Sequence, residues 1–238
     1  MFLTLVLLLT MSMPAVADRS AELERQLGKR DAIGDYIYGG QIPSQVELSR
    51  YRSQSSSPCK GAHAEQAVEV AITSHWRWAV LYYTRELGDP QTRRAFDDSQ
   101  QALRYLVDEL SCDDPLIRYR YANNKHMQRD YEASVLALSR VVDDIGKHYP
   151  RMKLMALRQY ADALGITGDL DGAIATQRQL LAVVPGGVSV QLNLANRLAQ
   201  RGNPDDVKEA RALIAQARAS GVPEHGESII AGIEAMLP

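Results

Sequence analysis

Apolar residues in the middle of the chain recur at the three- and four-residue spacing of amphipathic helices. One such run covers residues 62–87 and stops at a Gly-Asp-Pro sequence at 88–90. A second run covers residues 91–110, and an Asp-Asp-Pro sequence at 113–115 restarts the chain after it. The spacing therefore predicts an antiparallel helical hairpin over residues 61–114.

The C-terminal half of the chain resembles itself at a fixed offset. Ala161 aligns with Ala195, and Leu164 aligns with Leu198, both at an offset of 34 residues. An earlier copy places Ala122 under Ala161 at an offset of 39. A fixed period of this length indicates stacked helix–turn–helix units rather than one closed core. We expect the five extra residues of the earlier copy within its second helix and the turn that follows it.

A 34-residue period with these residue types resembles the tetratricopeptide repeat (TPR) family. In that family small residues lie where paired helices cross, a glycine turn joins the helices and a proline ends the unit. The resemblance assigns these repeat-packing positions: Ala122, Tyr160, Ala161, Leu164, Gly168, Ala173, Pro185, Ala195 and Gly202. It implies an all-α fold, with a TPR-like α-solenoid of helix–turn–helix repeats over residues 115–238 that ends in a capping helix. The hairpin at 61–114 is then a divergent repeat.

Arrays of this family bind extended peptides or protein surfaces on a concave face, which is lined by the first helix of each unit. The resemblance places these partner-binding side chains there: Tyr119, Asn123, His126, Arg158, Asp162 and Asn196. Arg158 is the one cation in this inferred groove, and Asp162 lies one turn away, so the basic carboxylate clamp of some family members is not reproduced. The alternative is that these residues are ordinary solvated positions of a helix.

The N-terminus differs from the rest of the chain. Residues 1–17 carry no charge, contain an apolar run and end on Ala-Val-Ala, which is typical of a secretory signal peptide. We therefore expect export, to the periplasm, with no stable membrane insertion after cleavage. No Lys or Arg precedes the apolar run, and an uncleaved membrane anchor is the alternative interpretation. Residues 18–60 are interrupted by Gly, Pro and Ser, and are predicted to form a partly irregular arm.

The chain has two cysteines, Cys59 just before the predicted hairpin and Cys112 just after it. Both lie at the same end of such a hairpin, so in an oxidising compartment they predict one disulfide. Two buried free thiols are the alternative. A zinc site is less favoured because Cys59 and His63 supply only half of the usual ligands. We expect no metal and no cofactor.

The charge balance and the absence of known motifs argue against nucleic-acid binding and against several classes of enzyme. The 27 Lys and Arg residues nearly balance the 29 Asp and Glu residues, which leaves no cationic surplus to neutralise nucleic-acid phosphates. No nucleophile elbow, zinc-protease motif, phosphate-binding loop or dinucleotide fingerprint occurs. Paired aspartates at 113–114 and 205–206 lie beside prolines at expected helix starts, where carboxylates cap backbone N–H groups.

These observations predict a non-catalytic exported adaptor or scaffold that binds a protein or peptide partner through its concave face. The alternative is a cell-wall polysaccharide-binding subunit, or a divergent hydrolase, that uses the helical hairpin and its Trp76 and Trp78. Repeat positions alone do not specify the partner, since a fold does not fix a function. Self-association through the terminal repeats stays open.

Overall fold

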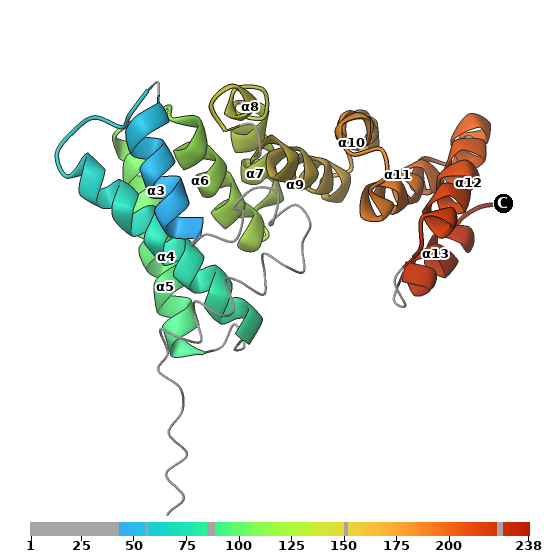
Figure 1. The fold of residues 1–238 in the computed structure, drawn as a ribbon, viewed down its shortest axis with the longest axis horizontal. Helices are drawn as coiled ribbons and strands as arrows, with labels where there is room; N and C mark the ends of the chain where they lie inside the picture. The colour runs from blue at the N-terminus through green and yellow to red at the C-terminus, as the bar shows by residue number, and fades with distance from the viewer. Residues whose placement is uncertain (1–42, 56, 85–88, 150–151, 223–225) are drawn as a thin grey trace, which may run out of the picture.

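The computed structural model describes residues 43–55, 57–84, 89–149, 152–222 and 226–238 (Figure 1). Every regular element in these ranges is a helix, which confirms an all-α fold for the described part of the chain. In chain order the helices are α3 (Pro43–Gln54), α4 (Ala64–Thr84), α5 (Pro90–Arg104), η1 (Tyr105–Glu109), α6 (Pro115–Met127), α7 (Tyr131–Ser139), α8 (Ile145–His148), α9 (Met152–Ile166), α10 (Leu170–Val183), α11 (Val188–Arg201), α12 (Pro204–Ala219) and α13 (Gly226–Glu234).

Helices α4 and α5 pack against each other as a hairpin. Asp89 caps α5 by accepting a hydrogen bond from the backbone N–H of Thr92 at 3.0 Å, and Pro90 opens the first turn. The far end of α5 continues into the π-helical turn η1. A disulfide joins Cys59 and Cys112, whose Cα atoms lie 4.9 Å apart, so the predicted disulfide is confirmed.

The prediction of an irregular arm over residues 18–60 is wrong for Pro43–Gln54, which form α3. This helix packs against α4 at one end of the molecule (Figure 1). The two side chains that it buries most are Glu47 and Tyr51, which lie one turn apart. Apolar spacing does not reveal such a helix, because one of its two main core positions holds a carboxylate. The predicted signal peptide, residues 1–17, lies outside the described residues, as does the rest of the arm up to residue 42.

Three helix pairs follow the hairpin, and they lie one after another along the molecule (Figure 1). They are α6 with α7, α9 with α10, and α11 with α12. Consecutive pairs contact each other through α7 and α9 and then through α10 and α11, while α13 packs on α11. Asp130 and Asp169 cap the second helices α7 and α10 by accepting hydrogen bonds from backbone N–H groups three residues ahead.

The extra residues of the first of these pairs form a separate element. We expected them to lengthen the second helix, but α7 ends at Ser139 after nine residues. A turn and the four-residue helix α8 follow, and Ile145 and Tyr149 at its two ends are buried. The insertion therefore adds packing beside α6 and α9 without extending α7.

The positions assigned to repeat packing divide into buried residues and turn residues. The buried ones are Ala122, Ala161, Leu164, Ala173 and Ala195, and Tyr160 is partly buried. The turn residues are Gly168, Gly202 and Pro185, all exposed. Gly168 and Gly202 have φ angles of 91° and 71°, which are left-handed values that favour glycine at the end of a helix.

The hydrophobic core consists of two clusters. The larger one gathers side chains from α3 to α10 together with Val190 of α11, and the smaller one gathers Ile174 of α10 with side chains of α11, α12 and α13. Leu181 packs against both clusters. The amide of the buried Gln177 on α10 makes no hydrogen bond with any described residue. The junction between the two clusters is thus at α10 and α11.

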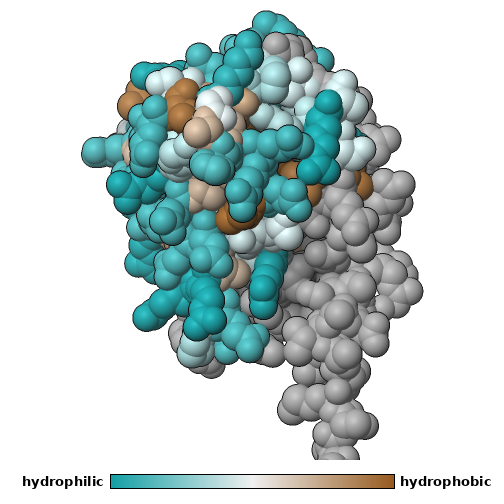
Figure 2. Space-filling model, turned by 90° about the vertical axis from the view of Figure 1, so that its left-hand side faces the viewer, coloured by the Kyte–Doolittle hydropathy of each residue, from teal (hydrophilic) through white to brown (hydrophobic). Residues whose placement is uncertain are grey.

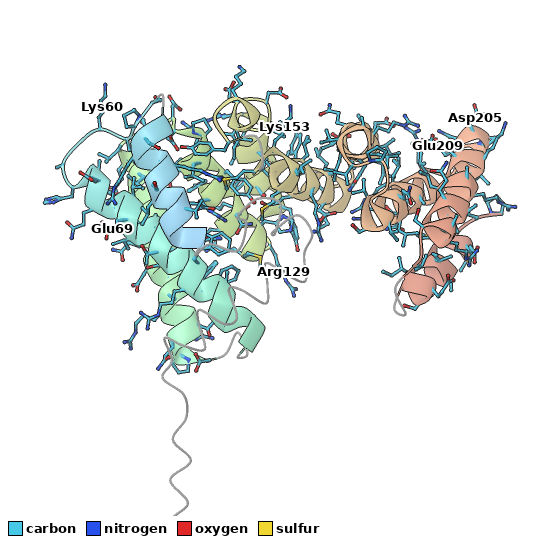
Figure 3. The ribbon with its side chains drawn as sticks, in the orientation of Figure 1. Lys60, Glu69, Arg129, Lys153, Asp205 and Glu209 are labelled. Carbon is cyan, nitrogen blue, oxygen red and sulfur yellow. A yellow bond between two sulfur atoms is a disulfide. The ribbon has the colours of Figure 1, made fainter. Side chains whose placement is uncertain are left out.

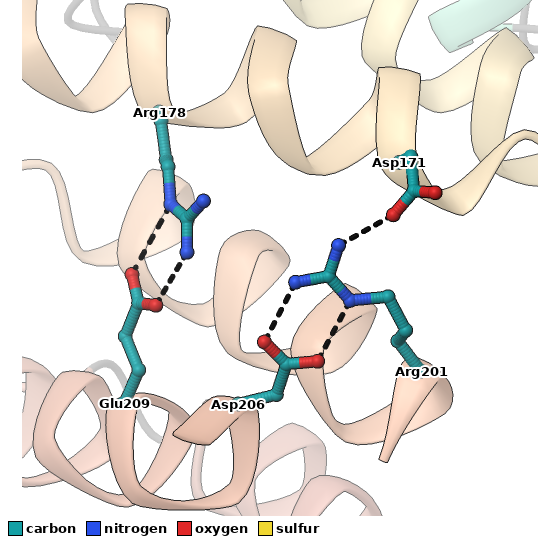
Figure 4. Close-up of polar contacts among 5 residues, drawn as sticks. All are labelled: Asp171, Arg178, Arg201, Asp206 and Glu209. Carbon is teal, nitrogen blue, oxygen red and sulfur yellow. Dashed lines mark hydrogen bonds and ion pairs between the residues drawn. The ribbon is translucent and has the colours of Figure 1, made fainter. Parts of the chain in front are cut away.

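Charged side chains cover the outside of the helices (Figure 3), including Asp205 and Glu209 on α12. Several of them connect successive helix pairs. Arg178 of α10 donates to Glu209 of α12 at 2.6 Å (Figure 4). Within the described ranges, no helix combines the length and apolar character needed to cross a lipid bilayer.

Candidate functional site

Tyr119 does not belong to a partner-binding surface, which corrects the assignment made from the repeat pattern. Its side chain is only 1% exposed. Helix α6 contacts both the α4–α5 hairpin and α9, so this position faces the core. The ring lies 5.3 Å from the guanidinium carbon of Arg120, and burial raises the pKa of the Tyr119 hydroxyl to about 12.

The other five predicted partner-binding residues keep part of their surface, and they lie on α6, α9 and α11. Asn123 of α6 donates from Nδ2 to Oε1 of Gln159 on α9 at 3.2 Å, which links two helix pairs. Asn196 of α11 accepts a hydrogen bond from Gln200 at 3.4 Å within its own helix. Both asparagines are therefore engaged within the protein.

A charged cluster forms around Asp162, in the middle of α9. Arg158 of the same helix, His126 of α6 and Arg197 of α11 all act electrostatically on its carboxylate. Burial raises the pKa of Asp162, and its electrostatic interactions with Arg158, Arg197 and His126 oppose the rise. Burial also lowers the pKa of His126, while the Asp162 carboxylate acts in the opposite direction. The first helices of three successive pairs thus contribute to one polar cluster.

Arg197 is a member of this cluster that the sequence analysis missed. Its guanidinium occupies the space directly above Gly165 of α9, where a Cβ atom would overlap it. Its Nη1 donates to Oε1 of Gln200 at 3.1 Å. The sequence signal for this contact is a glycine inside a helix, which can mark a close approach of a neighbouring group.

Three polar groups of the cluster have no hydrogen bond or ion pair with any residue in the described ranges. They are the Arg158 guanidinium, the Asp162 carboxylate and Nδ1 of His126. The His126 ring is held in place by an edge-to-face contact with Tyr131, with 5.1 Å between ring centroids. The Arg158 guanidinium and the partly buried Asp162 carboxylate are therefore available to a ligand on α9, whereas Nδ1 of His126 beside them is buried.

A second polar group lies inside the N-terminal half and was also missed. Arg120 of α6 is 1% exposed and forms a bidentate ion pair with Glu47 of α3, with Nε donating to Oε2 at 3.0 Å and Nη2 donating to Oε1. Its Nη1 lies 2.8 Å from Nε2 of His75 on α4. Because a guanidinium can only donate, Nε2 of His75 must accept this hydrogen bond.

The direction of the remaining hydrogen bonds follows from that constraint. The ring proton of a neutral His75 is on Nδ1, which donates to Oδ1 of Asn124 at 3.3 Å. Nδ2 of Asn124 donates to the hydroxyl of Ser99 at 3.3 Å, and this hydroxyl donates to the carbonyl of Ala71 at 3.1 Å. Burial and then the Arg120 charge hold the pKa of His75 well below its ordinary value, against the hydrogen bond with Asn124.

The two tryptophans that the sequence offered as a sugar-binding platform lie beside this network. Trp78 is 5% exposed, and its ring packs 5.2 Å from Phe96 and 5.8 Å from His75. Trp76 is partly buried, with the Arg120 guanidinium carbon 4.8 Å from its ring centroid. Both rings are thus used in internal packing.

In the part of the chain that the structure describes, no three His, Cys, Asp or Glu side chains gather as a metal site would require. Comparisons with family models, curated proteins and solved structures find no match for this chain. The fold and the sites therefore define an all-helical protein whose disulfide fits export to an oxidising compartment.

Proposed function

We propose that this chain is a non-catalytic helical scaffold, built like a TPR array, that binds a protein or peptide partner along α6, α9 and α11. The observation that carries the proposal is the pair of unengaged charged groups on Arg158 and Asp162, with His126 beside them. These groups lie together across two helix pairs. Elsewhere on the surface, many charged side chains are paired with one another.

The repeat interpretation is supported by the small residues that recur at equivalent positions of the first helices. Ala122, Ala161 and Ala195 are all completely buried. An alanine at a helix crossing lets two backbones approach closely, and three such crossings in succession favour an array of similar units. Such an array presents its first helices side by side, as a binding surface requires.

The chemistry of the surface suits an extended peptide segment. Arg158 can donate to a carbonyl or carboxylate oxygen, and Asp162 can accept from a backbone N–H group or a lysine. The ring of His126 lies beside them, with its Nδ1 buried. The proposal includes export to the periplasm, supported by the disulfide and by the pattern of residues 1–17.

Photo-crosslinking in the native host tests this function. A crosslinking residue is placed at Asn123 and, separately, at Arg158, with Lys208 on α12 as the control position. Lys208 is exposed and lies outside the three first helices. We expect one discrete protein adduct shared by the two test positions and missing at Lys208. The proposal is overturned if neither test position yields an adduct above the level of the control.

Affinity for the captured partner gives the second measurement. The double variant Arg158→Ala with Asp162→Ala should bind it at least about tenfold more weakly, because each lost charged hydrogen bond contributes about 1.5–3 kcal/mol. Lys208→Ala should bind like the parent. Since Arg158 and Asp162 make no hydrogen bond within the described protein, the double variant should keep the parental melting temperature.

A further inference from the structure

A cavity of about 350 Å³ opens between α4 and the segment formed by α5 and η1. Its apolar part is formed by Ala67 and Val70 of α4 and by Ala102 of α5, which recur at helical spacing. Val70 is 39% exposed, so an apolar side chain is left open to a ligand here. The volume falls within the range of small-molecule sites, about 300–1,000 Å³. We call this cavity the hairpin furrow.

Two carboxylates lie far apart in the furrow. Asp98 comes from α5 and Glu109 from the end of η1. At a rise of about 1.5 Å per residue, their Cα atoms lie roughly 15 Å apart along the segment. Glu109 is at the end nearer the start of α4, where its neighbour Leu110 approaches Gly61. The furrow therefore has one negative charge towards each end.

The π-helical turn η1 brings Glu109 into the furrow beside Tyr105. The N–H of Leu110 donates to the carbonyl of Tyr105, five residues earlier, at 3.0 Å. In this wider turn Tyr105 and Glu109 both line the furrow, whereas Asp108 points elsewhere and accepts a hydrogen bond from the Tyr121 hydroxyl at 3.1 Å. Turns of this type are frequent at functional sites.

The polar side chains of the furrow are unengaged. Gln66, Asp98, Gln101 and Glu109 make no side-chain hydrogen bond or ion pair with any described residue. The described lining contains no lysine and no arginine. The furrow is therefore acidic, and the two glutamine oxygens can accept hydrogen bonds from a ligand as well.

This lining suits a long cation with an apolar middle. A carboxylate towards each end attracts an ammonium group, while Ala67, Val70 and the ring of Tyr105 offer apolar contact to methylene groups between the charges. The described surface at this end of the molecule is largely hydrophilic, with only small and separate apolar areas (Figure 2). Such a surface favours a small polar ligand over a protein that docks through a broad apolar patch.

We propose that the hairpin furrow binds a linear polyamine, an unbranched chain of methylene groups with an ammonium group at each end. One terminal ammonium group pairs with Asp98 and the other with Glu109, and Gln66 and Gln101 accept further N–H groups. A lysine side chain has the same alkylammonium chemistry but only one charge, so it would satisfy one end of the furrow. The furrow lies on the hairpin and is separate from the proposed partner surface on α6, α9 and α11.

Spermidine is the probe, and it is titrated into the full chain by isothermal titration calorimetry. We expect saturable binding that is at least about tenfold tighter than that of n-butylamine or Nα-acetyl-lysine amide, which each carry one ammonium group. An absence of saturable spermidine binding up to about 10 mM would overturn the proposal. Equal affinity for spermidine and n-butylamine would refute recognition at two ends. Tighter binding of the lysine derivative than of spermidine would assign the furrow to a protein side chain and refute a free polyamine.

Variants then test whether the furrow is the binding site. Asp98→Asn with Glu109→Gln should lower the affinity for spermidine at least about tenfold and keep the parental melting temperature, since both carboxylates are exposed and unpaired. Asp97→Asn with Glu132→Gln is the matched control, because it removes the same charge from exposed positions outside the furrow. An equal loss of affinity in the two double variants would reduce the binding to general charge attraction and contradict the site.

A third variant tests the furrow without removing a carboxylate. Val70→Lys places an ammonium group of the protein itself in the furrow, where it competes with the ligand. We expect it to weaken spermidine binding at least about tenfold, whereas Val183→Lys, at an exposed position of α10, should bind like the parent. A parental affinity in Val70→Lys would place the ligand elsewhere and refute the proposal.

Discussion

Asp206 accepts two parallel hydrogen bonds from Arg201, one from Nε and one from Nη2, both at 2.7 Å (Figure 4). The third guanidinium nitrogen, Nη1, donates to Asp171 of α10 at 2.5 Å. Asp206 is 4% exposed, although it lies in the first turn of α12. One guanidinium therefore joins the turn between α11 and α12 to the preceding helix pair.

We expect Asp206→Asn to lower the melting temperature by several degrees, because the amide cannot accept both hydrogen bonds and leaves Arg201 less well paired. The neighbouring exposed Asp205 offers a matched control, and Asp205→Asn should change the melting temperature by less than half as much. Thermal unfolding followed by circular dichroism measures both. Equal effects of the two substitutions would show that the bidentate geometry has no special importance.

The same pair has a pH signature. The hydrogen bonds from Arg201 hold the pKa of Asp206 below its ordinary value. The stabilisation is therefore fully present above the unfolded-state pKa of about 3.9 and is lost as the pH falls through the lower folded-state value. The difference in stability between wild type and Asp206→Asn should shrink below about pH 4. A difference that stays constant down to pH 2 would contradict this assignment.

His75 should make the fold sensitive to mild acid. Its folded-state pKa lies well below the ordinary 6.5, so below about pH 6.5 the unfolded chain takes up a proton that the folded chain does not. Stability then falls as the pH is lowered, with a slope of up to about 1.4 kcal/mol per pH unit from this group. In urea titrations between pH 7 and 5, His75→Gln should reduce the slope.

The exposed His63 provides the control for that measurement, and His63→Gln should keep the wild-type slope. Glutamine at position 75 can still accept the hydrogen bond from Arg120, so the variant remains able to fold. If both substitutions leave the slope unchanged, the buried neutral imidazole makes no contribution to the acid sensitivity.

The disulfide should be the largest single covalent contribution to stability. Cys59 and Cys112 are 53 residues apart, and closing a loop of this length stabilises the fold by about 4 kcal/mol in the chain-entropy model. We expect the double variant Cys59→Ser with Cys112→Ala to shift the urea midpoint downward by a corresponding amount. Reductant should produce the same shift in wild type and none in the variant.

The substitution Gly165→Ala tests whether Arg197 contributes to partner binding without a loss of helix stability. Alanine is about 1 kcal/mol more favourable than glycine inside a helix, but its Cβ would displace the flexible Arg197 side chain. We expect stability to stay level or rise, while affinity for the crosslinked partner falls. Gly232→Ala, at a helical glycine with open space around it, is the control and should leave binding unchanged. A parental affinity in Gly165→Ala would exclude Arg197 from the partner site.

The helical pairs could be predicted because apolar and small residues follow helical spacing on both sides of clear turn signals. Helix α3 could not, since its buried face is made of Glu47 and Tyr51. Tyr119 was misplaced for a related reason. The repeat pattern assigns each position by analogy, whereas the contacts of α6 with the hairpin decide which of its faces meets water.

The candidate sites were also only partly predictable from the sequence. Arg158, Asp162 and His126 were predicted from the resemblance to the repeat family, which assigns positions on the first helix of each unit. Arg197 could not, because its position depends on the crossing of α11 over Gly165. The buried network is harder still, since Arg120 and Asn124 occupy core positions where the sequence gives no apolar signal. These two polar side chains are stable in the core because α3, α4 and α5 supply their hydrogen-bond partners.

The division of the core at α10 and α11 has a consequence for cooperativity. The smaller cluster depends on Ile174 and on the last three helices, and the unpaired amide of Gln177 lies in the helix between the clusters. An unpaired buried amide weakens that junction. We therefore expect the last three helices to open as a separate cooperative unit, whose backbone amides should exchange with solvent deuterium sooner than those of the disulfide-linked half.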